Sequence, residues 1–475
     1  MASFFHALKW SAAGEIASKA IQPVIFIFLA RLLTPDDYGI MAAALMVISF
    51  TQVFWDAGMG KALIQRQTDE IDAANAAFWI NLTLGLVLSV LLFFTASILA
   101  ERLFHDNRIT PVLQAMTLQI ILGSLSSIPT SLLQKQMKFN SLFWVRLLSI
   151  GVPGIFSIPL AYFGMSYWAL VVGTLVGQLM QVILLYGVVD WRPALTFNKA
   201  IAKELGKFAF WVGATGLLVW FFLWADSFII GAYLGTHELG LFRTGNMFVI
   251  MIYDGVLFGP LLPVLYSYIS KFYSDTEKVK SSAIKIIRII AIVGIPSCII
   301  LFSLADPVSN IIFGEKWTGV AFVIGMMALM RGYGWLVAVN SEIYRAVGKP
   351  QVETAVLGIS FLFFLPVYLI SVTKGFETFI IARLALGLFS LIPHFLLFNR
   401  LFKISLLPIV RTATICTICS LIVFAIDFPV AKFLPQDILH VLVTGSISIL
   451  VIGALILTLE RKFVRGLLNE FKERK

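Results

Sequence analysis

The 475-residue sequence has few cysteines, few histidines and little charge. Its three cysteines lie in apolar segments and predict no disulfide framework. The CxxC spacing of Cys416 and Cys419 is more typical of packing within a helix than of redox chemistry. The five histidines form no cluster with the cysteines, so no metal or nucleophile motif is present. We therefore expect neither an enzyme nor a protein that holds a metal or another cofactor.

Charged residues make up only 13% of the chain, whereas 59% of the residues are hydrophobic, and the mean hydropathy is +0.92. A soluble globule of this length needs far more polar surface. The composition therefore predicts a polytopic membrane protein. The N-terminal MASFFHALKW shows no small-residue cleavage site, so we expect no cleavable signal peptide.

Long apolar runs follow one another along the chain. A membrane-spanning helix needs about 20 apolar residues, and the sequence divides into about fourteen segments of that size. They lie near 11–33, 39–60, 74–100, 110–133, 140–162, 166–189, 208–233, 240–268, 284–305, 318–344, 351–372, 376–400, 404–427 and 438–460. The runs are continuous rather than alternating, which favours an all-α fold over a β-barrel.

The net charge of +10 raises the question of a nucleic-acid partner, but the positions of the charges argue against one. Most of the 36 lysines and arginines fall in the tails and in the loops on one side of the predicted spans. The loops on the other side hold only Arg102, Arg108, Lys316, Lys374 and Lys432. Such a bias sets the orientation of membrane proteins, with the basic side in the cytoplasm. We expect both termini to be cytoplasmic and no nucleic-acid partner.

The segment LTPDDYG, between the first two runs, is a predicted turn at a membrane face, because Pro and Asp end one helix and begin the next. It has a second copy: a shift of 201 positions brings Gly39 onto Gly240 and Gly58 onto Gly259. The offset later grows to 211, where Lys138 meets Lys349, and the longer loop SKFYSDTEKVKSSAIK absorbs the growth. Spans 1–6 and 7–12 are therefore two predicted copies of one six-helix unit.

Because six is an even number, both copies have the same orientation, related by a pseudo-two-fold axis along the membrane normal. Transporters with such parallel repeats bind substrate between the halves, and the halves rock. The predicted parts are an N-lobe (1–190), a C-lobe (191–403), two extra helices (404–460) and a basic cytoplasmic tail (461–475).

Ionisable side chains inside the predicted spans are the candidate site residues, because such residues usually face protein or water. An excess of buried cations suits an anionic cargo, and Arg can bind phosphate oxygens in bidentate fashion. The candidate substrate-binding cations are Lys19, Arg146, Arg243 and Arg331. The candidates for a polar cavity or for coupling to an ion gradient are Glu15, Gln22, Gln52, Asp56, Asp226, Asn246 and Asp254. Structural alternatives stay open, namely an ion pair of Glu15 with Lys19 and an inter-helix hydrogen bond of Asp226.

Several fragments resemble one known family. FLARLLTPDDYGIMAAALMVISF (28–50), DAGMGKALIQR (56–66), FGEKW (313–317) and the DTEK loop (275–278) are similar to the polysaccharide transporter (PST) family of Wzx-type flippases, in its colanic-acid exporter branch. That family belongs to the MOP exporter superfamily, together with the multidrug and toxin extruders (MATE) and the lipid II flippase. The resemblance covers essentially the whole chain.

The resemblance implies a V-shaped, two-lobed fold in the bacterial inner membrane. The implied cargo is a polyprenyl-diphosphate-linked oligosaccharide that passes from the cytoplasmic to the periplasmic leaflet for surface polysaccharide synthesis. The expected partners are this substrate and membrane lipids, with the polysaccharide polymerase and glycosyltransferases as further candidates. Glu15, Asp56 and Asp254 are candidates for coupling to an H⁺ or Na⁺ gradient. The alternative on the same fold is a cation-coupled drug antiporter, which would favour buried carboxylates over cations.

Overall fold

The computed structural model describes residues 2–56, 58–259, 261, 265, 268–269, 275–346, 350–431 and 437–473, and in this part of the chain the regular structure is helical. The chain divides into two compact units, residues Met1–Arg243 and Thr244–Lys475. These units are defined by compactness and meet at residue 243, whereas the repeats predicted from sequence similarity meet near residue 190. The repeats stay a prediction. Each unit is described here by itself.

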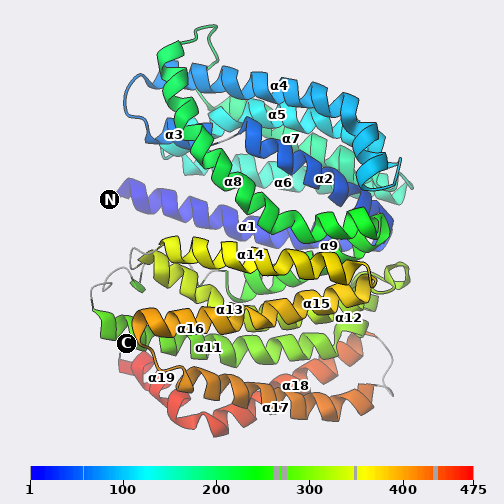
Figure 1. Ribbon diagram of the computed structural model, residues 1–475, viewed down its shortest axis with the longest axis vertical. Coiled ribbons are helices and arrows are strands. Elements are labelled where there is room, and N and C mark those ends of the chain that lie inside the picture. Colours follow the sequence, from blue (N-terminus) through cyan, green and yellow to red (C-terminus); the bar gives the residue numbers. More distant parts are fainter. Residues whose placement is uncertain are drawn as a thin grey trace. The chain divides into compact units, whose positions relative to one another are not determined.

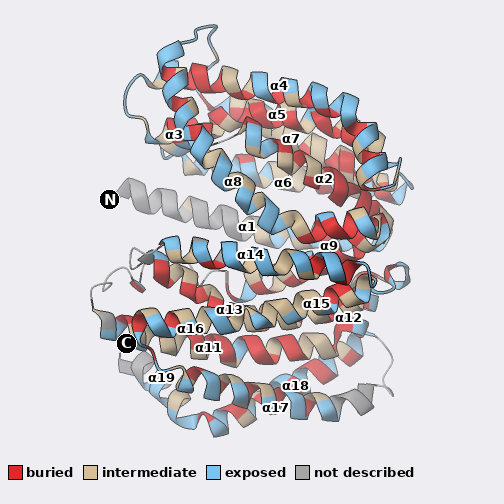
Figure 2. Ribbon diagram, in the orientation of Figure 1, coloured by how far each residue is buried: buried red, intermediate tan, exposed pale blue. Residues whose placement is uncertain are grey.

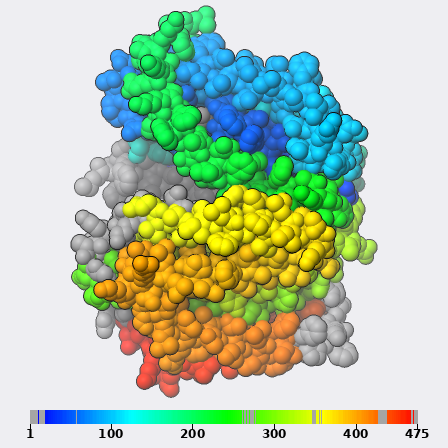
Figure 3. Space-filling view, viewed as in Figure 1, coloured from blue at the N-terminus to red at the C-terminus, as the bar shows by residue number. Residues whose placement is uncertain are grey.

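The first unit contains nine elements (Figure 1). They are α1 (Ala2–Leu32), α2 (Pro35–Trp55), α3 (Met59–Gln65), α4 (Glu70–Leu103), α5 (Ile109–Lys135), α6 (Phe139–Tyr162), α7 (Trp168–Val188), α8 (Lys199–Tyr233) and the first half of α9 (Thr236–Ile250). α4 packs on α5, α6 on α7, and α1 on α6. α8 packs against α2, α3 and α4, and green atoms run over the blue surface of the earlier helices in Figure 3.

The second unit holds the rest of α9 and the elements that follow it. They are the π-helix η1 (Met251–Leu257), α11 (Thr276–Ser303), α12 (Ala305–Ile312), the 3₁₀ turn η2 (Glu315–Trp317), α13 (Val320–Ala346), α14 (Pro350–Val372), α15 (Phe376–Phe389), α16 (Leu391–Phe402), α17 (Leu407–Ala431), α18 (Ile438–Leu459) and α19 (Arg461–Glu473). α11 is central, packed against α13 and α17, and its inner face is buried (Figure 2).

Among the described residues, twelve helices are long and apolar enough to cross a membrane. The predicted spans near 11–33 and 240–268 are not among these twelve; they fall on α1 and, as far as their residues are described, on α9 and η1. The all-α membrane fold is therefore confirmed.

Local chemistry explains the first predicted turn. Thr34 caps α2: its Oγ1 accepts a hydrogen bond from the Asp37 backbone N–H at 3.3 Å, and Asp37 Oδ2 accepts one from the Thr34 backbone N–H at 2.8 Å. Pro35 follows as the first helical residue, where its missing N–H costs nothing. The Asp37 carboxylate also accepts a hydrogen bond from the Ser166 hydroxyl, which ties this turn to the loop before α7.

Four helix boundaries differ from the sequence expectations. The span predicted at 39–60 is broken after Trp55, where Gly58 adopts a φ of 76° that favours glycine. α8 begins at Lys199 rather than near 208, because Asn198 caps it. α11 begins at Thr276, capped by Asp275, so the loop predicted there is shorter. The segment predicted as one helix at 376–400 is broken at Ser390, three residues before Pro393, whose ring disfavours a continuous helix.

Candidate functional site

A cavity of about 1060 Å³ lies within the first unit, lined by amide and hydroxyl side chains interspersed with apolar ones, and is referred to below as the polar cavity. It is lined from α2, α3, α5, α7 and α8, and two of the residues predicted from sequence, Gln52 and Asp56, contribute to its wall. Its polar lining residues are Ser49, Gln52, Asp56, Lys61, Gln119, Ser126, Ser127, Thr130, Ser131, Gln134, Gln178, Gln181 and Thr215. Amides and hydroxyls therefore outnumber charges in this cavity.

One stretch of α5 supplies most of the hydroxyls. Ser126, Thr130 and Ser131 each donate to a carbonyl of their own helix, at 2.9, 2.7 and 3.0 Å. This back-bonding satisfies each hydroxyl proton within the apolar surroundings and leaves oxygen lone pairs as acceptors. The Gln178 side chain, on α7, donates to Ser126 Oγ at 3.2 Å and joins the two helices across the cavity wall.

Asp56 is fixed at the end of α2. Its backbone N–H bonds to the Gln52 carbonyl at 3.0 Å, and its Oδ1 accepts a hydrogen bond from Ser127 Oγ at 2.8 Å. Asn81, which is fully buried, donates to the same Ser127 oxygen at 3.4 Å. The carboxylate is thus half-buried and is held by neutral donors. Among the described residues, the structure records no ion pair for it.

Two buried polar atoms of the cavity wall have no hydrogen-bond partner among the described residues, namely Trp55 Nε1 and Gln119 Oε1. Trp55 is only 5% exposed. Its indole packs against Gly123, where an added Cβ would lie 2.9 Å from the ring. Buried polar groups are nearly always bonded, so these two atoms are unusual features of the wall behind the exposed amides and hydroxyls.

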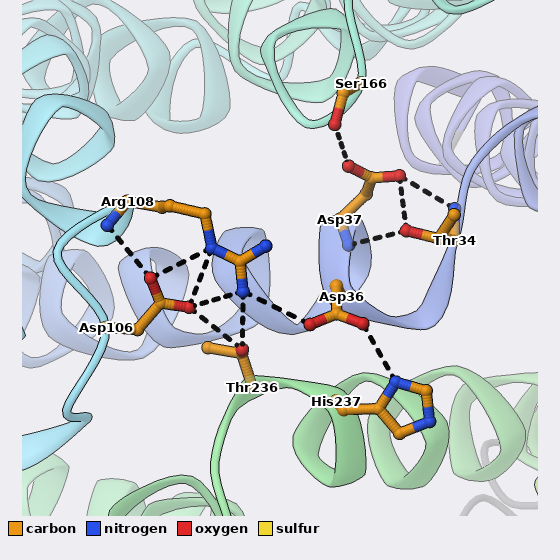
Figure 4. Close-up of polar contacts among 8 residues, drawn as sticks. All are labelled: Thr34, Asp36, Asp37, Asp106, Arg108, Ser166, Thr236 and His237. Atoms are coloured by element: carbon orange, nitrogen blue, oxygen red, sulfur yellow. Dashed lines mark hydrogen bonds and ion pairs between the residues drawn. The ribbon is translucent and has the colours of Figure 1, made fainter.

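A second polar cluster joins the α1–α2 turn, the loop before α5 and the start of α9 (Figure 4). Arg108 Nη2 lies 3.2 Å from Asp36 Oδ1 and 2.7 Å from Asp106 Oδ2. His237 Nδ1 lies 2.9 Å from Asp36 Oδ2, and Thr236 Oγ1 donates to Asp106 Oδ2 at 3.0 Å. Asp36 and His237 occupy equivalent positions under the shift of 201 residues, so the two copies of the turn meet each other here.

The Arg108 cluster lowers the pKa of the Asp106 carboxyl group. Partial burial of Asp106 acts to raise the pKa of its carboxyl group, but the hydrogen bonds from Arg108 and Thr236 outweigh this effect and hold the pKa below its ordinary value. The hydrogen bond to Asp106 in turn raises the pKa of the Arg108 guanidinium. The cluster therefore holds its charges as ion pairs at neutral pH.

The predicted cations lie at separate places in the chain. In the first unit, Lys19 is half-buried on α1 and Arg146 is exposed on α6. Arg243, on α9, stacks on the Trp224 ring with 4.1 Å from the guanidinium carbon to the centroid. Its Nη1 donates to Ser227 Oγ at 3.4 Å, and Ser227 donates to buried Asp226 through both its backbone N–H (2.5 Å) and its hydroxyl (3.0 Å).

In the second unit the structure brings two predicted residues together. Arg331 Nη1 lies 3.3 Å from Asp254 Oδ2, and Asp254 Oδ1 accepts a hydrogen bond from Trp335 Nε1 at 3.0 Å. Asp254 lies in η1, and π-helical turns are frequent at functional sites. Asn246 is buried, and its Oδ1 has no hydrogen-bond partner among the described residues.

Two further predicted residues lie on α1. Gln22 is exposed. The Glu15 side chain lies outside the described part of the chain, so its pairing with Lys19 stays a prediction. Among the described residues, no group of three or more His, Cys, Asp or Glu side chains has the arrangement of a metal site, and Cys298, Cys416 and Cys419 are free and buried.

Sequence reasoning missed most of the polar cavity. It treated Lys61 as a loop charge and did not single out Gln119, Gln178, Gln181 or Trp211. The available signal was the polar run in GSLSSIPTSLLQ (123–134) inside an otherwise apolar helix, together with the two glutamines three residues apart on α7. Sequence reasoning also missed His237. The available signal was the shift of 201 positions, which brings Asp36 onto His237.

Comparisons with known proteins agree with this architecture. The sequence profile of the family described as "Polysaccharide biosynthesis protein" matches residues 28–322. The succinoglycan biosynthesis transport protein ExoT of Rhizobium meliloti is 26% identical over 323 residues, which are 68% of this chain and 65% of ExoT, so the match spans less than two thirds of that protein. The lipopolysaccharide biosynthesis protein WzxC of Escherichia coli is 22% identical over 358 residues, 75% of this chain and 71% of WzxC.

Two solved structures share the fold. The lipid II flippase MurJ, in an inward closed conformation, aligns with a TM-score of 0.78 at 15% identity, over 97% of this chain and 100% of MurJ. An inward-facing multidrug resistance MATE family transporter of the MOP superfamily aligns with a TM-score of 0.63 at 14% identity, over 82% of this chain and 94% of that one. At these identities the likeness concerns the fold alone, and it confirms the predicted fold class. The profile match extends over more than half of the sequence, and the chain belongs to the polysaccharide biosynthesis protein family.

Proposed function

We propose that this protein is a flippase, which moves a polyprenyl-diphosphate-linked oligosaccharide from the cytoplasmic to the periplasmic leaflet during the synthesis of exopolysaccharide, capsule or O-antigen. The observation that carries the proposal is the fold shared with the lipid II flippase over nearly the whole chain, in a member of a polysaccharide biosynthesis family. A diphosphate and a string of sugar hydroxyls cannot cross hydrocarbon unaided, since each unsatisfied polar group costs several kcal/mol. A transporter is required for such a cargo, rather than an enzyme.

In the proposed mechanism the two predicted lobes rock about a central cavity, while the polyprenyl tail stays in lipid. The cations Lys19, Arg146, Arg243 and Arg331 bind the diphosphate. Two contacts support this role for Arg243 and Arg331. The stacking of Arg243 on Trp224 fixes the plane of its guanidinium, and the ion pair with Asp254 orients Arg331. Asp56, Asp226 and Asp254 are proposed candidates for coupling to an H⁺ or Na⁺ gradient.

The proposed location is the bacterial inner membrane, with both termini in the cytoplasm, because the basic residues gather on that side of the predicted spans. Membrane lipids and the lipid-linked oligosaccharide are the proposed partners. The polymerase and the glycosyltransferases that make and consume this cargo are further proposed partners.

The test is reconstitution of the purified protein into liposomes with a fluorescent lipid-linked oligosaccharide. Leaflet exchange is measured by quenching of the outer leaflet, with and without an H⁺ or Na⁺ gradient. We expect exchange that depends on the protein. Protein-dependent efflux of a cationic drug, in the absence of lipid exchange, would instead identify the antiporter, the alternative suggested by the MATE-like fold.

A further inference from the structure

The polar cavity of the first unit has a lining suited to a neutral, hydroxyl-rich ligand. Five of its lining residues are glutamines: Gln52, Gln119, Gln134, Gln178 and Gln181. An amide offers both a donor and an acceptor, as a sugar hydroxyl does, so the two groups pair in either direction. The hydroxyls of α5 add acceptors, because their protons are already donated to the helix backbone.

The charges in this lining do not suit a diphosphate. They are one carboxylate, Asp56, and one ammonium group, Lys61. Asp56 would repel an anionic ligand, and Lys61 is exposed on α3. The other cations that the sequence singled out, Lys19, Arg146, Arg243 and Arg331, are not part of the lining. A diphosphate site would therefore lie elsewhere, and this cavity would hold another part of the cargo.

Aromatic rings complete the lining. Phe208 and Trp211 lie three residues apart on α8, and so on one side of that helix. Trp211 is 68% exposed although it belongs to a helix that packs on three others. The C–H faces of sugar rings stack on aromatic rings, while the hydroxyls at their edges bond to amides. The cavity presents both kinds of group.

We propose that this cavity is the binding subsite for the neutral glycan of the lipid-linked cargo, separate from the cations that bind the diphosphate. The inference rests on the proposed flippase function and adds the part of the substrate that this unit recognises. The volume of about 1060 Å³ is slightly above the range of about 300–1,000 Å³ for small-molecule sites, which suits an oligosaccharide better than a single sugar.

The test separates the sugar from the diphosphate. Full-length protein in nanodiscs is titrated with two probes: the repeat-unit oligosaccharide hydrolysed from the host's own surface polysaccharide and labelled at its reducing end, and polyprenyl diphosphate that carries no sugar. The variants are Trp211→Ala and Gln181→Ala. Their matched controls are Trp144→Ala, an exposed tryptophan on α6, and Gln114→Ala, a glutamine of α5; neither residue lines the cavity.

We expect the wild type to bind the released oligosaccharide, and each cavity variant to bind it at least tenfold more weakly. The controls should bind both probes as the wild type does, and the cavity variants should retain wild-type affinity for the sugar-free lipid. The proposal is overturned if the wild type does not bind the oligosaccharide, if the cavity variants bind it unchanged, or if they lose the sugar-free lipid to the same extent.

Leaflet exchange in proteoliposomes distinguishes the two proposals. If the wild type does not exchange the lipid-linked oligosaccharide, the flippase function is wrong, whatever the titrations show. If the wild type exchanges it and the cavity variants do so at an equal rate under subsaturating cargo, the flippase function stands and the glycan subsite is wrong.

Discussion

Gly39 and Gly240 meet backbone to backbone, in a reciprocal contact. A Cβ added to Gly39 would lie 1.7 Å from the Thr236 carbonyl oxygen, and one added to Gly240 would lie 1.8 Å from the Pro35 carbonyl oxygen. Pro35 and Thr236 are themselves equivalent under the shift of 201 residues, as are Asp36 and His237, which bond to each other. The starts of α2 and α9 therefore cross in the manner of a local two-fold axis, and only glycine permits so close an approach.

Replacing either glycine should disrupt this crossing. We expect Gly39→Ala or Gly240→Ala to destabilise the protein by about 1–3 kcal/mol, because backbone atoms must move to admit the methyl group. The measurement is the thermal unfolding midpoint in detergent. Gly187→Ala, in α7, is the control, since nothing lies within 4 Å of its added Cβ, and it should be neutral or slightly stabilising.

The Asp36–His237 contact joins the two copies of the repeated turn, so rocking of the lobes would have to open it. We expect the double variant Asp36→Cys/His237→Cys to form a disulfide that stops leaflet exchange and that reduction reverses. The single variants should exchange normally, because a contact between two partly exposed side chains contributes at most about 1 kcal/mol. Full exchange by the quantitatively cross-linked protein would show that this contact stays closed throughout transport.

The Asp106 carboxylate gives a pH dependence with a defined sign. Its pKa in the folded protein is below the ordinary value of 3.8, so its ion pair stabilises the fold at pH values above about 4 and loses that effect as the pH falls further. Asp106→Asn should therefore unfold at a lower temperature than the wild type at pH 7, and the difference should shrink below pH 4. Asp190→Asn, at an exposed pair with Lys138, should show no such difference.

Neutralising the proposed diphosphate ligands should abolish transport without loss of protein. We expect Lys19→Gln or Arg243→Gln to fail to complement a flippase-null strain, at unchanged abundance in the membrane. Lys203→Gln, an exposed lysine on α8, is the matched control and should complement. Normal capsule or O-antigen output from the first two variants would remove these residues from the site.

A buried ion pair connects the last helices to α11. Arg288 Nη2 lies 2.7 Å from Glu460 Oε2, Thr412 donates to the other carboxylate oxygen at 3.0 Å, and Arg288 covers the Phe463 ring. Glu460 is 5% exposed, so Glu460→Gln should cost about 3 kcal/mol by leaving the guanidinium charge uncompensated. Denaturant titration would measure the loss. The exposed pair of Lys278 with Asp275 is the control, and Lys278→Ala should cost less than about 1 kcal/mol.

The sequence by itself determined the fold class, because hydropathy and charge placement are local quantities. Continuous apolar runs require helices in a bilayer, and the signal in LTPDDYG places Thr34, Pro35 and Asp37 at the start of α2. The repeat could also be predicted, since Gly39 and Gly240 are conspicuous within apolar segments. Helix ends were less predictable where a polar extension continued past the apolar run, as in α8 and α11.

Only the tertiary structure decided which polar residues share a surface. Gln52 and Asp56 were visible from sequence as polar residues in a span, but Gln119, Gln178 and Trp211 join them through the packing of α5 and α8 on α2 and of α7 on α5. In the same way, Arg331 became the partner of Asp254 through a π-helical turn that no periodicity indicates. Hydrophobic pattern fixes which residues enter a membrane, whereas the side-chain packing of separate helices fixes which of them meet.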